Sequence, residues 1–132
     1  MSGELGYMDS SAITKLVVDE AESAALRAFL ASGPVVATSA LALVEVVRAV
    51  RAQGPAAVAL ARAVLSTIEI VELTDSIASD AATPDPPLLR SLDAIHLATA
   101  RALGDQLGPV ITYDRRMQEA IIALGLTLAA PA

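Results

Sequence analysis

Short runs of apolar and β-branched residues alternate with longer segments of helical periodicity along the chain. Strands are predicted over Leu5–Met8, Val35–Thr38, Ile68–Leu73, Val110–Thr112 and Leu126–Leu128. Helices are predicted over Ser10–Val17, Glu22–Leu30, Ala40–Gln53, Ala56–Leu65, Thr74–Ala81, Leu88–Arg101 and Arg116–Leu124. This alternation indicates an α/β fold, in which a parallel sheet of four or five short strands is flanked by helices on both faces. No linker or internal repeat interrupts the pattern, so we expect a single domain over residues 1–132.

The helix predicted over Leu88–Arg101 is apolar on nearly every side, with residues such as Leu92 and Ala98 at helical spacing. Such a helix is normally covered by protein. Its first turn nevertheless contains Asp93, and a carboxylate entering a core needs a hydrogen bond, a cation or a metal. Two interpretations remain open: Asp93 follows a Ser91 cap and interacts with the helix N-terminus, or it belongs to an acidic site.

Two further acids stand where strands end. Asp9 follows the strand Leu5–Met8, Asp114 follows the strand Val110–Thr112, and each precedes a helix. The carboxyl ends of parallel strands lie at one edge of a sheet, which is the edge where α/β proteins bind ligands. The helix of Asp93 directly precedes the strand Val110–Thr112, and a right-handed connection would bring its first turn near this edge. We therefore expect three carboxylates in one crevice.

Glu45 is a fourth candidate for this crevice. It lies away from the centre of the apolar face of its helix, among small alanines that leave room for a cleft. A solvated pair with Arg48 is the alternative explanation. His96 lies one turn after Asp93, and we expect a structural or capping role for it rather than metal ligation.

Several carboxylates in one crevice repel each other, so a cation must lie between them or some of them must be protonated. Oxygen ligands of this kind favour Mg²⁺ or Mn²⁺. Zinc fits poorly, because the chain has no cysteine and a single histidine. Carboxylate clusters that hold metal serve chiefly to activate water and to bind phosphoryl oxygens.

Composition narrows the functional classes. The chain has 132 residues, 55% of them hydrophobic, and a formal net charge of −6 with a pI of about 4.6. This acidity argues against broad nucleic-acid binding but not against an enzyme that holds phosphate through a metal. The three aromatic residues are too few for a base-stacking platform. No apolar run reaches the roughly 18 residues of a membrane span, and the first residues do not resemble a signal peptide, so we expect a cytoplasmic protein.

Four motifs together resemble those of a known family. They are Tyr7–Ala12 (YMDSSA), Thr38–Arg48 (TSALALVEVVR), Leu92–Ala98 (LDAIHLA) and Thr112–Met117 (TYDRRM). Each motif alone is weak, but their order and spacing resemble the PIN-domain ribonucleases, and most closely the VapC toxins of bacterial toxin–antitoxin pairs. The resemblance covers nearly the whole chain. Its departures are a few extra residues before the first strand and an unusual Gly6 within it.

The resemblance implies a PIN-like fold and an RNA substrate, with transfer RNA or another structured RNA as the target. It implies that Mg²⁺ or Mn²⁺ is the cofactor and that water activated by the metal attacks the phosphodiester. The implied catalytic acids are Asp9, Glu45, Asp93 and Asp114. Of these we expect Asp9, Asp93 and Asp114 to hold the metal, with Asp9 and Asp93 as the principal ligands and with Asp114 and Glu45 completing the pocket directly or through water. Ser10, Ser11 and Thr112 match hydroxyl positions that support the pocket. Arg90, Arg115 and Arg116 lie next to the acids in the sequence and are candidates to hold flanking phosphates, with ordinary solvation as the alternative.

The resemblance also implies a small VapB-like antitoxin as partner, and a homodimer. Apolar residues on the early helices and on the helices Ala40–Gln53 and Ala56–Leu65 suit a groove for an amphipathic antitoxin helix. Those on the early helices are Ile13, Leu16, Val17, Leu26, Phe29 and Leu30. The alternative is that they only fill the core.

Three other functions are weighed against this one. A phospho-receiver domain also has an acidic Mg²⁺ pocket, but it needs a lysine after a late strand, and the only lysine is Lys15. A haloacid-dehalogenase-like phosphatase needs Asp-x-Asp after its first strand, where this chain has Asp9, Ser10 and Ser11. A catalytically idle interaction domain on the same fold has no reason to keep four matching carboxylates.

Overall fold

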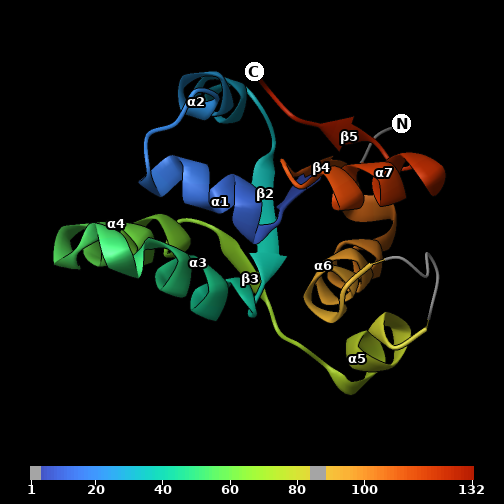
Figure 1. Ribbon diagram of the computed structural model, residues 1–132. Coiled ribbons are helices and arrows are strands. Elements are labelled where there is room, and N and C mark those ends of the chain that lie inside the picture. Colours follow the sequence, from blue (N-terminus) through green and yellow to red (C-terminus); the bar gives the residue numbers. More distant parts are fainter. Residues whose placement is uncertain (1–3, 84–88) are drawn as a thin grey trace.

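The computed structural model describes residues 4–83 and 89–132 (Figure 1). Its centre is a parallel sheet with the strand order β3-β2-β1-β4-β5. The strands are β1 (Leu5–Met8), β2 (Val35–Ser39), β3 (Glu69–Val71), β4 (Leu107–Ile111) and β5 (Leu128–Ala129). The central strand β1 pairs with β2 on one side and with β4 on the other. The predicted α/β fold with a parallel sheet is confirmed.

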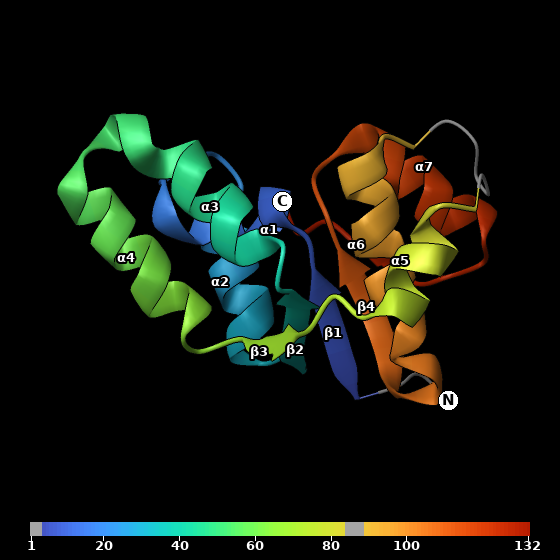
Figure 2. The same ribbon diagram turned by 90° about the horizontal axis from the view of Figure 1, so that it is seen from below.

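Helices cover both faces of this sheet (Figure 2). One side carries α1 (Ser10–Val17), α2 (Ser23–Ala31), α3 (Ala42–Val50) and α4 (Pro55–Leu65), and the other carries α5 (Asp75–Ala81), α6 (Ser91–Ala102) and α7 (Arg115–Ala123). Each side has its own core: Met8 and Ile111 contribute to the first, and Tyr7 and Val110 to the second. Because consecutive side chains of a strand point to opposite faces, β1 and β4 supply both cores.

The predicted elements are present with shifted ends. The helix expected from Ala40 begins at Ala42, because Ser39 remains in β2, where its hydroxyl accepts the N–H of Leu41. β4 begins at Leu107, earlier than predicted. Short 3-10 helices, η1 (Arg51–Gln53) and η2 (Gly104–Gln106), follow α3 and α6.

The apolar helix predicted over Leu88–Arg101 is α6, and its exposed residues differ from the prediction. It begins at Ser91, and the predicted start at Leu88, like most of the predicted loop Thr83–Pro87, lies outside the described residues. Its buried residues are the run His96–Ala100, more than a full turn, so this part of the helix is covered on all sides. Leu92, expected on the covered side, is 48% exposed because the first turn of α6 extends beyond the core.

The unusual Gly6 has a packing reason. A Cβ atom at this position would lie 3.1 Å from Cγ of Pro34 and 3.2 Å from Cγ1 of Val36, closer than ordinary contacts. Glycine therefore lets the segment at the start of β2 lie tightly against β1. Across residues 4–83 and 89–132, no helix has the length and hydrophobicity needed to cross a membrane.

Candidate active site

The predicted acids gather where the strand order reverses. From β1 the chain moves to β2 and β3 on one side, and later returns to β4 and β5 on the other. Open α/β sheets form ligand-binding crevices at such a switch point, beyond the carboxyl ends of the strands. Met8 at the end of β1 is paired with Ile111 at the end of β4. The residues that follow them, Asp9 and Thr112, therefore lie side by side.

Asp9 is almost completely buried, with 3% of its surface exposed. Its Oδ1 accepts hydrogen bonds from Oγ of Ser11 at 2.6 Å and from the N–H of Ala12 at 3.1 Å, so that Asp9 also caps α1. Its Oδ2 accepts a hydrogen bond from Oγ1 of Thr112. Burial raises the pKa of Asp9, and the two hydroxyl hydrogen bonds oppose that rise. The carboxylate is thus held in one orientation.

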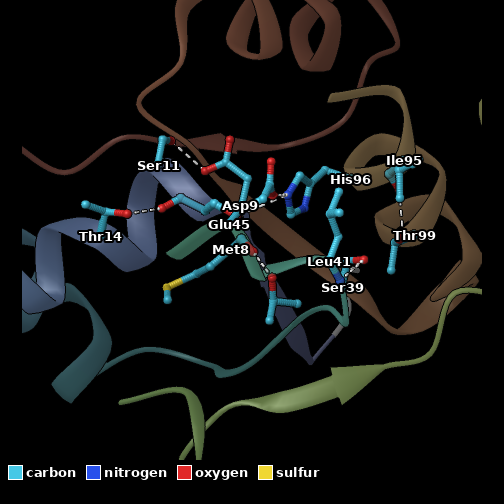
Figure 3. A network of polar contacts seen from close by, with 12 residues as sticks. Met8, Asp9, Ser11, Thr14, Ser39, Leu41, Glu45, Ile95, His96 and Thr99 are labelled. Atoms are coloured by element: carbon cyan, nitrogen blue, oxygen red, sulfur yellow. Dashed lines mark hydrogen bonds and ion pairs between the residues drawn. The ribbon is translucent and has the colours of Figure 1, made fainter. Parts of the chain in front are cut away.

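Glu45 reaches the same edge from the first turn of α3. Its Oε1 accepts a hydrogen bond from Oγ of Ser10 at 2.6 Å and lies 2.7 Å from Nε2 of His96 (Figure 3). Partial burial acts to raise the pKa of Glu45, but the hydrogen bonds from His96 and Ser10 outweigh it and the pKa is lowered. The alternative pair with Arg48 is absent from the ion pairs between described residues.

His96 belongs to a buried chain of polar groups that the sequence did not reveal. It is 2% exposed, and its Nδ1 lies 2.6 Å from the hydroxyl of Tyr7. That hydroxyl also accepts the N–H of Ser39 at 3.1 Å. One sequence signal was available: His96 follows Asp93 by three residues, which puts both on one side of α6. No sequence signal indicated its contact with Glu45 or its hydrogen bond with Tyr7.

Asp93 lies half-buried in the first turn of α6. The interpretation of Ser91 as the cap is wrong, because the N-cap position is Arg90 and no side chain caps the helix there. The pKa of Asp93 is raised, first by burial and then by the negative charges of Asp114 and Asp9. This mutual influence indicates that the acids share one electrostatic environment.

Asp114 caps α7 in the way that Asp9 caps α1. Its Oδ1 accepts the N–H of Met117 at 3.1 Å. Its own N–H donates to Oγ1 of Thr112 at 3.1 Å, the hydroxyl that also holds Asp9. The predicted supporting hydroxyls therefore lie against the acids: Ser10 contacts Glu45, Ser11 contacts Asp9, and Thr112 contacts both Asp9 and Asp114.

Within residues 4–83 and 89–132, no three acids or histidines stand in an arrangement that would by itself hold a metal ion. The donor chemistry nevertheless fits Mg²⁺ or Mn²⁺, because carboxylate oxygens from four elements face one edge of the sheet. None of the described groups donates a hydrogen bond to the Asp93 carboxylate. Burial and then the charges of Asp114 and Asp9 raise its pKa, and a bound cation would offset both effects by favouring the ionised form.

A cavity of about 520 Å³ lies beside Glu45 and Asp114 and extends to Lys15. Lys15 is paired there with Glu20 at 3.2 Å and Glu22 at 3.0 Å, so its charge is already compensated. The three arginines considered for RNA phosphates, Arg90, Arg115 and Arg116, are all exposed. None of them takes part in an ion pair with a described residue, which leaves their charges available.

Comparison with known proteins identifies the family. A family model described as the PIN domain matches residues 7–122. The chain is 44% identical over 125 residues to Ribonuclease VapC46 of Mycobacterium tuberculosis, covering 95% of this chain and 96% of that protein. It is 40% identical over 130 residues to Ribonuclease VapC47 of the same species, with the same shares covered.

Two solved structures have the same fold. VapC20 of M. tuberculosis, described as a sarcin-ricin loop cleaving toxin, aligns with a TM-score of 0.74 and 24% identity over 96% of this chain and 99% of that one. A toxin–antitoxin complex from Klebsiella pneumoniae aligns with a TM-score of 0.73 and 23% identity, covering 96% of this chain and 98% of that one. The predicted resemblance is thus confirmed, and the chain belongs to the PIN-domain family, among its VapC ribonucleases.

Proposed function

We propose that this chain is a metal-dependent endoribonuclease that acts in the cytoplasm as the toxin of a toxin–antitoxin pair. The observation that carries the proposal is the meeting of four acids at the switch point of the sheet, with hydroxyls that donate to two of them, Asp9 and Glu45. Asp9, Asp93 and Asp114 would hold Mg²⁺ or Mn²⁺, and Glu45 would complete the site directly or through a water molecule. Kinship with proteins named Ribonuclease VapC supports the same activity.

When bound, the ion supplies positive charge to the phosphoryl oxygens and favours ionisation of a water molecule. Asp9 contributes a fixed carboxylate, since Ser11 and Thr112 already orient both of its oxygens. Glu45 is ionised and accepts a hydrogen bond from the attacking water, which orients the water toward phosphorus. The bond between phosphorus and the 3′ oxygen breaks, so the products carry a 5′-phosphate and a 3′-hydroxyl.

The direct test incubates the purified chain with total RNA in Mg²⁺, in Mn²⁺ and in excess chelator, followed by sequencing of the RNA ends. We expect discrete cuts that need the metal and leave 5′-phosphates. Products with 2′,3′-cyclic phosphate, or full activity in chelator, would contradict the mechanism. No cleavage under any metal condition would favour the idle interaction domain. The phospho-receiver alternative is weakened because Lys15, the single lysine, is paired with two glutamates.

The substrate that we propose is a structured RNA, such as transfer RNA. The net charge of −6 disfavours broad binding, and it suits an enzyme that contacts a few phosphates near the acids. Arg90, Arg115 and Arg116 are exposed and border the acidic residues in sequence, which supports a role on flanking phosphates. The same sequencing experiment identifies the RNA and the bond.

A VapB-like antitoxin is the proposed partner, seated in an apolar groove. The early helices offer less than expected, because Ile13 and Leu26 are buried in the core. On α3, which is also part of the expected groove, Val44 is 57% exposed. A groove of about 580 Å³ between α3 and α4 is bordered by Arg48 and Arg62, which suits an amphipathic helix with acidic flanks.

Co-expression with the product of the adjacent open reading frame tests the partner. A small protein that co-purifies and suppresses cleavage supports it. If nothing co-purifies and the free chain is harmless when overproduced, the toxin assignment fails even though the fold is right. Homodimerisation stays a prediction, to be checked by the mass of the free chain in solution.

A further inference from the structure

The buried chain from Tyr7 through His96 to Glu45 is not explained by the acidic cluster alone. Its three residues come from β1, α6 and α3, and it crosses from one core of the protein toward the crevice. Tyr7 is fully buried and His96 is nearly so. Buried polar groups are costly unless they are satisfied, and such networks hold their members in one geometry when every group is paired.

The hydrogen-bond partners determine which ring nitrogen of His96 carries the hydrogen. Glu45 is an ionised carboxylate, so Oε1 can only accept, and Nε2 of His96 must donate to it. The Tyr7 hydroxyl already accepts the N–H of Ser39, which leaves its own hydrogen for Nδ1 of His96. A tyrosine hydroxyl keeps its hydrogen at neutral pH, because the ordinary pKa of a phenol is about 10. A hydrogen on Nε2, with Nδ1 as the acceptor, satisfies every group in the chain.

All described hydrogen bonds to Glu45 fall on one of its two oxygens. Ser10 and His96 both contact Oε1, at 2.6 Å and 2.7 Å. A carboxylate is planar, so fixing one oxygen from two directions also fixes where the other points. Oε2 is the oxygen that remains for the crevice.

We propose that His96 is a positioning residue, which holds Oε1 of Glu45 through Nε2 and thereby presents Oε2 to the metal and the attacking water. Tyr7 fixes the other end of the imidazole by its hydrogen bond to Nδ1. The inference rests on the proposed function, because it assigns His96 a part in the same site. Outer partners of this kind are typically worth about 10- to 100-fold in metal affinity or activity.

Two substitutions separate the two ring nitrogens. The amide of His96→Asn reaches the place of Nδ1 but not Glu45, whereas the amide of His96→Gln reaches the place of Nε2 and can donate to Oε1. Ser23→Ala is the matched control: Ser23 is a fully buried hydroxyl that donates to the carbonyl of Lys15 and has no bond to the acids. Its loss reports the effect of a missing buried hydrogen bond on stability alone.

The measurements are Mn²⁺ affinity by electron paramagnetic resonance, and kcat and KM for RNA cleavage. We expect His96→Asn to lower Mn²⁺ affinity and kcat by about 10- to 100-fold with little change in KM for RNA. His96→Gln should recover most of both, and Ser23→Ala should change neither. The proposal is overturned if His96→Asn behaves as Ser23→Ala does, or if His96→Gln is no better than His96→Asn.

A spectroscopic test needs neither metal nor RNA. His96 is the single histidine, so nitrogen-15 spectra of untagged protein report its tautomer without ambiguity. We expect the Nε2–H form, and the Nδ1–H form would overturn the inference. A parent chain that binds Mn²⁺ but cleaves no RNA would refute the proposed ribonuclease, while the tautomer and the Mn²⁺ affinities of the variants would still decide the role of His96.

Discussion

The two halves of the acidic cluster are built differently. Asp9 and Glu45 each receive at least two hydrogen bonds from described side chains or backbone, and their orientations are set by the fold. Asp93 receives none from the described groups, and its pKa is raised by burial and by the acids around it. Asp9 and Glu45 form the held half, which is oriented before any ligand arrives. Asp93 forms the open half, which depends on a cation to offset its charge.

Asp9 and Asp114 show that the same local motif can leave an acid buried or only partly buried. Each follows a parallel strand, each caps a helix, and each accepts an N–H from the third residue onward at 3.1 Å. Asp9 is buried because β1 is the central strand, with a neighbour on each side and Thr112 directly across. Asp114 lies two residues beyond that position, at the crevice. The position of each acid relative to the sheet therefore decides how far it is buried.

The largest effect is expected from breaking the held half with Asp9→Asn. The substitution removes a negative charge with little change of shape, and we expect cleavage to fall by more than the roughly 100-fold typical of an outer partner. The metal-free variant should be at least as stable as the parent, since burial disfavours the charge of Asp9. Initial cleavage rates and urea unfolding measure both effects.

The control for Asp9→Asn is Asp19→Asn, an exposed acid paired with Arg27 at 3.4 Å and remote from the cluster. It should retain full activity. An Asp9→Asn protein that cleaves RNA as fast as the parent would show that the metal site has been assigned to the wrong acids.

A smaller loss is expected when the support of the held half is weakened with Thr112→Val. The variant loses the hydroxyl that donates to Asp9 and accepts the N–H of Asp114. We expect a decrease of about 10- to 100-fold in kcat, and recovery in Thr112→Ser, which keeps the hydroxyl. Equal rates for the Val and Ser variants would mean that the hydroxyl does not orient Asp9 for catalysis.

The contrast between the halves also shows how far sequence reasoning reaches. Asp9 and Asp114 were predictable, because a strand pattern that ends in an acid before a helix has a local signature. The chain from Tyr7 to His96 joins residues 89 positions apart and depends on how α6 packs against β1. No periodicity relates them. The exposure of Leu92 was mispredicted for the same reason, since only tertiary packing decides which turn of an apolar helix is covered.

A third test adds Mn²⁺ to the metal-free protein and follows thermal unfolding. A ligand at ten times its Kd stabilises the folded state by about 1.4 kcal/mol, which raises the melting temperature of a domain of this size by several degrees. We expect this shift in the parent and its loss in Asp93→Asn at the same concentration. Asp105→Asn, an exposed acid in η2, should keep the shift. A full shift in Asp93→Asn would exclude Asp93 as a ligand.

The smallest effect concerns the pH dependence of stability without metal. The pKa of Asp93 is raised above its ordinary value of 3.8, so between these two values the folded protein binds more protons than the unfolded chain. The free energy of unfolding therefore falls as the pH rises through that window. Asp9 acts in the same direction. Glu45, whose pKa is lowered, acts oppositely, and its contribution is lost as the pH falls through its lowered pKa.

Removing the charge of Asp93 should raise the free energy of unfolding at neutral pH and leave it nearly unchanged in acid. We expect Asp93→Asn to be more stable than the parent at neutral pH and to differ little from it below pH of about 3.8, where the parent's Asp93 is protonated in both states. Urea unfolding at a series of pH values measures the difference. Asp105→Asn supplies the comparison for a solvent-exposed carboxylate. If both variants follow the parent at every pH, the acids do not strain the metal-free fold, and the open half needs no cation to offset its charge.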